Sequence, residues 1–192
     1  MTDQDDAATG RLFVITGAQA AGKSTVAQAL AAALTKAVFI DGDLIGNSVV
    51  SGKELITEPA TVAAIEQLFL RYAGALALAD VYRTAGFDAV IADNIFGDYL
   101  DDFLEIAAPE RVHLVMLHPS IDTIYDRDAQ RRKNAYRDGV TVEDLWHTIE
   151  DHTTRAGLWI DTTSMSVAQT ITKILRSLDE AAVDTTALAA TE

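Results

Sequence analysis

Residues 17–24 read Gly-Ala-Gln-Ala-Ala-Gly-Lys-Ser, which completes the pattern G-x-x-x-x-G-K-[ST]. A loop of this spacing directs consecutive backbone N–H groups at phosphate oxygens, and its glycines allow the positive φ and close approach that this requires. We expect the lysine to reach the β and γ phosphates and the serine hydroxyl to ligate Mg²⁺. The residues predicted to bind the nucleotide phosphates are Gly17, Ala18, Gln19, Ala20, Ala21, Gly22, Lys23, Ser24 and Thr25.

The sequence on either side of this loop fits the motif. Residues 12–16 are a short apolar run of the kind that forms a buried parallel strand. After the loop, Val26, Leu30 and Leu34 recur at helical spacing in an alanine-rich stretch. A strand, a glycine loop and a helix are the context that a phosphate-binding loop needs, and the helix N-terminus adds partial positive charge there.

Composition limits the classes of protein that remain. The chain has 192 residues, no cysteine, an acidic N-terminus and a net charge of −14 at pH 7. These values predict one domain without disulfides or a secretory signal, and they argue against a broad nucleic-acid surface. Because no apolar run approaches the roughly 20 residues of a membrane helix, we expect a cytoplasmic protein without a membrane partner.

Apolar runs alternate with helical patterns along the chain. The predicted strands cover residues 12–16, 38–40, 89–92, 112–117 and 158–160. Two helices are also predicted, because apolar residues recur at helical spacing and so share one face of each helix. These residues are Val62, Ile65, Phe69, Tyr72 and Leu76 in the first helix, and Val167, Ile171, Ile174 and Leu178 in the second. Ser166 and Gln169 form the capping-box pattern at the start of the second helix. This alternation predicts an α/β fold, a five-stranded parallel sheet with helices on both faces. We expect one domain at residues 11–179, with a disordered N-terminus at 1–10 and a flexible tail at 180–192.

Carboxylates follow two of the predicted strands. Asp41 and Asp43 come after the second strand and Asp93 after the third, and ligands bind at this end of a parallel sheet. We expect Asp43 to orient an acceptor hydroxyl, Asp93 to hold Mg²⁺ together with Ser24, and Asp41 to support either role. The alternatives are that the Asp-Gly-Asp turn only caps the next helix and that Asp93 only ends a strand. Asn94 stands next to Asp93, where many hydrolysing ATPases have a glutamate that activates water.

The one basic cluster of the chain spans residues 127–137. Arg127 and Arg131 are four residues apart and share a helical face, so we predict a short lid that closes over the nucleotide and stabilises the transferring phosphate. The alternative is a solvated helix with an ion pair between Asp128 and Arg132.

These features together resemble the small P-loop kinases. The features are the loop at 17–24, Ile-Asp-Gly-Asp at 40–43, Val-Ile-Ala-Asp at 90–93 and the arginine segment. Chloramphenicol phosphotransferase is the closest likeness, and zeta-toxin, shikimate and gluconate kinases are similar in plan. The resemblance implies the P-loop NTPase fold and transfer of the γ-phosphate of ATP, with Mg²⁺, to a hydroxyl of a small molecule such as an antibiotic, a sugar or a nucleotide sugar.

The resemblance also suggests roles for particular residues. In related kinases the second acid of an Asp-x-Asp pair lies at the acceptor hydroxyl, which corresponds to Asp43, and substrate-specific segments follow the second strand, which corresponds to residues 44–80. A monomer or a homodimer is expected. Two other functions stay open: an ATP-dependent switch or ATPase without an acceptor, and a nucleotide kinase.

Overall fold

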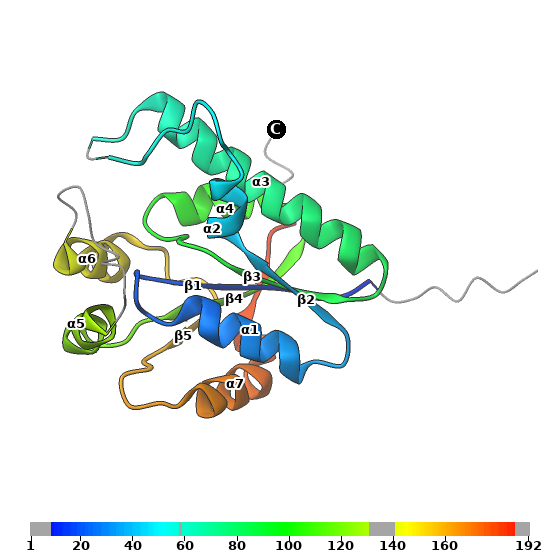
Figure 1. The fold of residues 1–192 in the computed structure, drawn as a ribbon. Helices are drawn as coiled ribbons and strands as arrows, with labels where there is room; N and C mark the ends of the chain where they lie inside the picture. The colour runs from blue at the N-terminus through cyan, green and yellow to red at the C-terminus, as the bar shows by residue number, and fades with distance from the viewer. Residues whose placement is uncertain (1–8, 58, 131–140, 187–192) are drawn as a thin grey trace, which may run out of the picture.

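Five parallel strands form the centre of the computed structural model, in the order β2–β3–β1–β4–β5 (Figure 1). The structure describes residues 9–57, 59–130 and 141–186. Its strands are β1 (Leu12–Gly17), β2 (Ala37–Asp41), β3 (Asp88–Ala92), β4 (Arg111–Leu117), β5 (Leu158–Ile160) and β6 (Ala182–Asp184). The predicted parallel sheet is confirmed, because all five predicted runs form its strands.

The sixth strand, β6, runs antiparallel to β4 and was not predicted. It pairs with residues 111–113, while β5 occupies residues 115–117 of the same edge. The Thr185 hydroxyl then donates to the carbonyl of Glu110 at 2.7 Å. β6 lies within residues 180–192, for which the sequence analysis predicted a flexible tail. The prediction of a tail arose because an alanine- and threonine-rich segment has little strand propensity of its own. Pairing with an open sheet edge supplies the order that local sequence does not.

Helices cover both faces of the sheet (Figure 1). They are α1 (Lys23–Ala33), α2 (Gly42–Asn47), α3 (Val62–Thr84), α4 (Tyr99–Ala107), α5 (Ile121–Ala129), α6 (Val142–His152), α7 (Val167–Arg176) and α8 (Leu178–Ala181). α1 and α7 pack on one face and α3 and α4 on the other. The predicted capping box at the start of α7 is confirmed, with the Ser166 side chain accepting from the Gln169 N–H.

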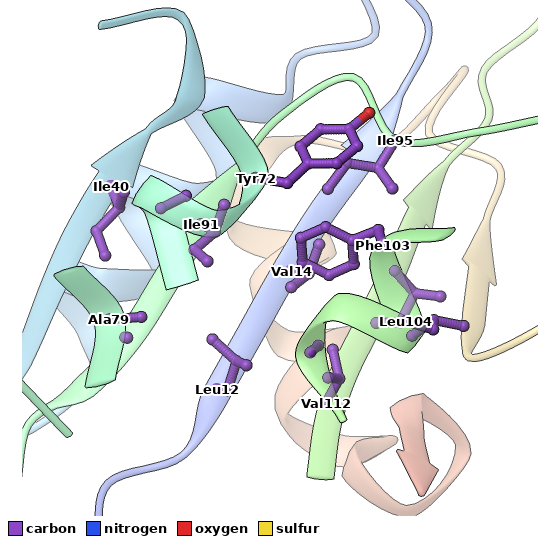
Figure 2. Packing of buried hydrophobic residues seen from close by; sticks show 14 of the residues in the cluster. Leu12, Val14, Ile40, Tyr72, Ala79, Ile91, Ile95, Phe103, Leu104 and Val112 are labelled. Atoms are coloured by element: carbon purple, nitrogen blue, oxygen red, sulfur yellow. The ribbon is translucent and has the colours of Figure 1, made fainter. Parts of the chain in front are cut away.

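Alternation along β1 divides the core between the two faces. Leu12 and Val14 face the α3 and α4 side, whereas Phe13 and Ile15 face α1 and α7. Figure 2 shows the first of these layers, in which Tyr72 of α3 meets Phe103 of α4 edge to face at 5.4 Å between ring centroids. Every residue of β1 is buried, so the strand that leads into the phosphate-binding loop is fixed from both sides.

The sequence analysis expected no segment long and apolar enough to span a membrane, but α3 is long and apolar enough by these two criteria. Among the described residues it is the one helix that meets that test, with 23 residues and an 18-residue window of mean hydropathy 1.4. Length and composition are weak grounds for a membrane span, since core helices of soluble proteins pass the same test. This helix packs on the sheet through Tyr72, Ala75 and Ala79, while Leu70 and Val81 are exposed.

Candidate active site

The phosphate-binding loop connects β1 to α1 and has the backbone that its glycines predict. Gly17 has a φ of 140°, and a Cβ there would lie 2.3 Å from the carbonyl oxygen of Leu117. Gly22 has a φ of 103° and is the N-cap of α1, so the helix begins at Lys23. Side chains are excluded at Gly17 by the neighbouring strand and disfavoured at Gly22 by the left-handed backbone.

The side chains of the loop are placed for an anion. The Lys23 ammonium donates to the carbonyl of Ala18 at 2.8 Å and therefore lies folded over the loop. Ser24 and Thr25 are exposed in the first turn of α1, which carries no acidic residue. Free N–H groups at a helix start, a lysine and a hydroxyl together make a site for a phosphate chain.

The strand order determines what flanks this loop. β1 lies between β3 and β4, so the chain crosses to opposite sides of it, and ligands bind in the crevice at such a point. Ala92 is in register with Ile15 on one side and with Asp41 on the other. The carboxylates after β2 and β3 therefore meet at the edge of the sheet where the loop begins, as predicted.

Asp93 is a buried carboxylate that is paired with Arg71 of α3. Its side chain is 1% exposed. The Arg71 Nε–H donates to Asp93 Oδ2 at 2.8 Å, Nη2 contacts Oδ1, and the Asn94 N–H donates to Oδ1 at 2.6 Å. The sequence analysis missed Arg71. The sequence does contain a signal for this residue, because Arg71 is the single charged residue between Glu66 and Asp80 in an apolar helix.

Arg71 also reaches the acid that was predicted to face the acceptor. Its Nη2 lies 3.2 Å from Asp43 Oδ1, and the Asp43 side chain is 68% exposed. Asp41 instead accepts from the Asp43 N–H at 2.9 Å and caps α2, so the interpretation of this turn as a helix cap is confirmed for Asp41. One guanidinium thus joins a buried carboxylate to an exposed one beside the loop.

Gly42 shows how tightly these groups pack. A Cβ at this position would lie 1.9 Å from Asp93 Oδ2. At Gly46, one turn later in α2, a Cβ would lie 3.2 Å from Cδ of Arg71, its nearest neighbour. α2 therefore lies directly against the Arg71–Asp93 pair, and its first residue has no room for a side chain.

The predicted metal ligands are only partly free. Both oxygens of Asp93 are engaged by Arg71 and Asn94, so a cation bound there would compete with a guanidinium. Ser24 is exposed at the loop and suits Mg²⁺, which takes few protein ligands besides phosphate oxygens and water. Within the described ranges, no three His, Cys, Asp or Glu side chains are grouped to hold a metal. Metal binding by Ser24, Asp41 and Asp93 stays a prediction.

Arg127 lies on the opposite side of the loop. From α5 it donates Nη1–H to the carbonyl of Ala21 at 2.9 Å and Nη2–H to the carbonyl of Thr162 at 3.0 Å. The arginine therefore ties the loop to the segment after β5. Arg131, its predicted companion in the lid, lies outside the described residues.

A pocket of about 280 Å³ opens beside Arg127. It is lined by Ala20, Gly22, Thr25, Arg127, Thr162, Met165, Val167 and Thr170. Thr162 is 3% exposed and its hydroxyl has no hydrogen-bond partner among the described residues. A buried hydroxyl without a partner is costly unless a ligand or water completes it.

His118 directly follows β4, the strand that pairs with β1 next to the loop. Its ring stacks on Trp146 at 4.9 Å between centroids, and Nε2 lies 2.9 Å from Glu150 Oε2. Burial lowers the pKa of His118, and the hydrogen bond to Glu150 opposes that shift. α6 is thereby joined to the strand that borders Gly17.

Comparison with solved structures identifies the fold as that of the P-loop kinases. A sugar kinase from Janibacter sp. HTCC2649 has a TM-score of 0.64 and 19% identity, covering 90% of this chain and 96% of its own. The tunicamycin resistance protein of Deinococcus radiodurans has a TM-score of 0.65 at 17% identity, and the match covers 91% of this chain and 98% of that protein. The APS kinase of Mycobacterium tuberculosis, solved with AMPPNP and APS, has a TM-score of 0.65 at 16% identity, covering 89% and 98%.

Residues 12–155, most of the chain, match the protein-family model described as AAA domain. The chain therefore belongs to that family. Comparison with curated proteins finds no match. These results support the predicted relation to P-loop kinases in general, while the nearer likeness to chloramphenicol phosphotransferase stays a prediction.

Proposed function

We propose that the protein is an ATP-dependent phosphotransferase that moves the γ-phosphate of ATP to a hydroxyl of a small molecule. The observation that carries the proposal is Asp43, an exposed carboxylate held by Arg71 at the sheet edge where a complete phosphate-binding loop begins. Phosphoryl transfer needs little more than positioning and charge stabilisation around such a pair of sites. Several solved structures of the same fold are named as kinases of small molecules, including gluconokinase and shikimate kinase, which adds support.

Each side of the loop has its own task in this proposal. Lys23 leaves the carbonyl of Ala18 to neutralise the β and γ phosphates, and Asp43 accepts the proton of the attacking hydroxyl. Ser24 would hold Mg²⁺, which would supply positive charge against the phosphate charge that develops during transfer. Arg127 keeps the loop against the segment after β5.

The pocket beside Arg127 suits the base of the nucleotide. It adjoins the loop on the side away from Asp43, and apolar side chains such as Met165 and Val167 form part of its wall. Thr162 lines the same pocket, and its buried hydroxyl has no hydrogen-bond partner among the described residues. ATP then extends from this pocket across the loop, with its γ-phosphate toward the carboxylates.

The test is phosphorylation of a panel of sugars, antibiotics and nucleosides with ATP labelled at the γ-phosphate. We expect Asp43→Asn and Lys23→Ala to abolish labelled product while circular dichroism stays unchanged. Asp179→Asn, an exposed acid on α8, is the matched control and should retain activity. Undiminished transfer by Asp43→Asn would refute the assigned base. Label appearing only as inorganic phosphate with every acceptor would instead indicate an ATPase or switch.

A further inference from the structure

Asn94 is a polar residue next to the site, and the proposed function does not use it. It follows Asp93 directly after β3, where many hydrolysing ATPases have a glutamate. The residue is half-buried, and its side-chain oxygen Oδ1 is buried without a hydrogen-bond partner among the described residues. Such an oxygen costs free energy, so the fold itself gains nothing from a carboxamide at this position. The surroundings of Asn94 therefore bear on what it could bind.

On one side, the backbone of Asn94 lies beside the start of the phosphate-binding loop. β3 pairs with β1, and Ala92 is in register with Ile15. The pairing extends one residue beyond the strand, because the Asp93 N–H donates to the Ile15 carbonyl at 3.3 Å. Continuing the same register by two residues from Ala92 places Asn94 beside Gly17, the first residue of the loop.

On its other side, β3 pairs with β2, the strand that leads to the proposed base. Ala92 is in register with Asp41 there, and Asp43 comes two residues later in the first turn of α2. Asn94 likewise comes two residues after Ala92. Asn94 therefore lies between the start of the loop and Asp43.

Hydrogen bonds fix the backbone around Asn94. Its N–H donates to Asp93 Oδ1 at 2.6 Å, and its carbonyl accepts from the Tyr72 hydroxyl at 3.0 Å. The next residue, Ile95, donates its N–H to Thr16 Oγ1 at 2.9 Å, and the Thr16 hydroxyl donates to the Ile95 carbonyl at 2.8 Å. A side chain on so constrained a backbone is held at a defined point, as a binding residue requires.

The two neighbours of Asn94 indicate the direction of its side chain. Asp93 points to α3, where it pairs with Arg71, and Ile95 belongs to the core layer against α3 and α4 (Figure 2). Along a strand and its direct continuation, alternate residues point to opposite faces of the sheet. The Asn94 side chain is therefore directed, like that of Ala92, to the face that carries α1. α1 begins at the phosphate-binding loop, so this is the side of the sheet on which a bound phosphate chain lies.

We propose that the carboxamide of Asn94 binds the γ-phosphate of ATP by donating an N–H to one of its oxygens. This inference rests on the proposed function, in which the γ-phosphate lies between the loop and Asp43. Because Oδ1 is the buried end of the carboxamide, the NH₂ group is the end available to a ligand, and an amide N–H is a donor for phosphate oxygens. A neutral donor suits this place, since a further carboxylate beside Asp43 and Asp93 would repel the phosphate.

The experiment compares nucleotides with and without a γ-phosphate. Isothermal titration calorimetry measures the affinity of the full chain for AMPPNP and for ADP, each with Mg²⁺. We expect Asn94→Asp to weaken AMPPNP binding at least tenfold, because it places a carboxylate against the γ-phosphate, and to change ADP binding less than about twofold. Asn94→Leu should weaken AMPPNP binding about threefold through the loss of one hydrogen bond, again with little effect on ADP. Gln28→Glu changes an exposed amide on α1 in the same way and is the matched control, which should change both affinities by the same factor.

Equal effects of Asn94→Asp on AMPPNP and ADP, or no effect on either, would overturn the inference and leave nucleotide binding intact. Failure of the unchanged chain to bind either nucleotide would instead refute the proposed function and the inference with it.

A second measurement uses the unchanged chain, in case Asn94→Asp does not fold. The chain has three asparagines, so labelling them with ¹⁵N gives few side-chain amide signals, and the signal of Asn94 is the one missing from Asn94→Leu. This signal should shift further with AMPPNP and Mg²⁺ than with ADP and Mg²⁺. Equal shifts, or none, would overturn the inference.

Discussion

Arg71 pairs with two carboxylates that differ in burial, and this difference leads to a quantitative prediction about the free energy of unfolding. Arg71→Met removes the guanidinium but keeps an apolar stem in α3. Asp93, at 1% exposure, then stays buried without a counter-ion, and breaking a buried pair in this way costs about 3–5 kcal/mol. Asp43→Ala removes the other partner, which is 68% exposed, and such surface pairs contribute less than about 1 kcal/mol. The first variant should therefore lose a large part of a stability of about 5–15 kcal/mol, and the second almost none.

Urea unfolding followed by circular dichroism measures both effects. With a denaturant dependence of about 2 kcal/mol per molar, Arg71→Met should lower the midpoint by about 2 M. Adding Asp93→Asn to Arg71→Met should restore part of the loss, because the amide leaves no uncompensated charge. A change below about 1 kcal/mol for Arg71→Met would refute the reasoning, since the buried carboxylate would then be tolerated without its partner.

Three further predictions follow from single contacts. Gly42→Ala should destabilise the fold by about 1–3 kcal/mol in urea unfolding, because its Cβ would lie 1.9 Å from a buried carboxylate oxygen. Gly46→Ala should cost clearly less, because its Cβ would lie 3.2 Å from Cδ of Arg71 and calls for a much smaller shift; equal effects of the two variants would contradict this. Arg127→Met should weaken ATP binding about tenfold by calorimetry, since charge-assisted hydrogen bonds of about 1.5–3 kcal/mol hold the loop, and unchanged affinity would argue against that role. Burial lowers the pKa of His118 below 6.5 despite its bond to Glu150, so the unfolded chain takes up the proton first and stability falls as pH drops below about 6.5. His118→Gln should flatten that fall between pH 7.5 and 5.5 in thermal unfolding, and an equally steep fall would exclude this histidine as a cause.

Much of the fold could be predicted because its signals are local. The five parallel strands are short apolar runs, and the loop at 17–24 fixes its own backbone through Gly17 and Gly22. The capping box at Ser166 likewise involves residues only three positions apart. β6 could not be predicted in this way, because its order depends on an edge of β4 that lies some 70 residues earlier.

The candidate site shows the same division between local and distant signals. Asp43 and Asp93 were found because each follows an apolar strand. Arg71 was missed because its role depends on partners 22 and 28 positions away in the sequence, which α3 brings to the edge of the sheet. A lone charge in an apolar helix is a usable signal for such a residue, since a buried charge requires a partner.

The strand order also separates the two halves of the proposed site. The carboxylates come from the ends of β2 and β3, whereas Arg127 and Thr162 come from the elements after β4 and β5, and the loop after β1 lies between them. The acceptor half is therefore stabilised by the Arg71 group and the nucleotide half by contacts to the backbone of the loop. Because the two sets of contacts share no side chain, the acceptor half can differ in charge without disturbing the loop.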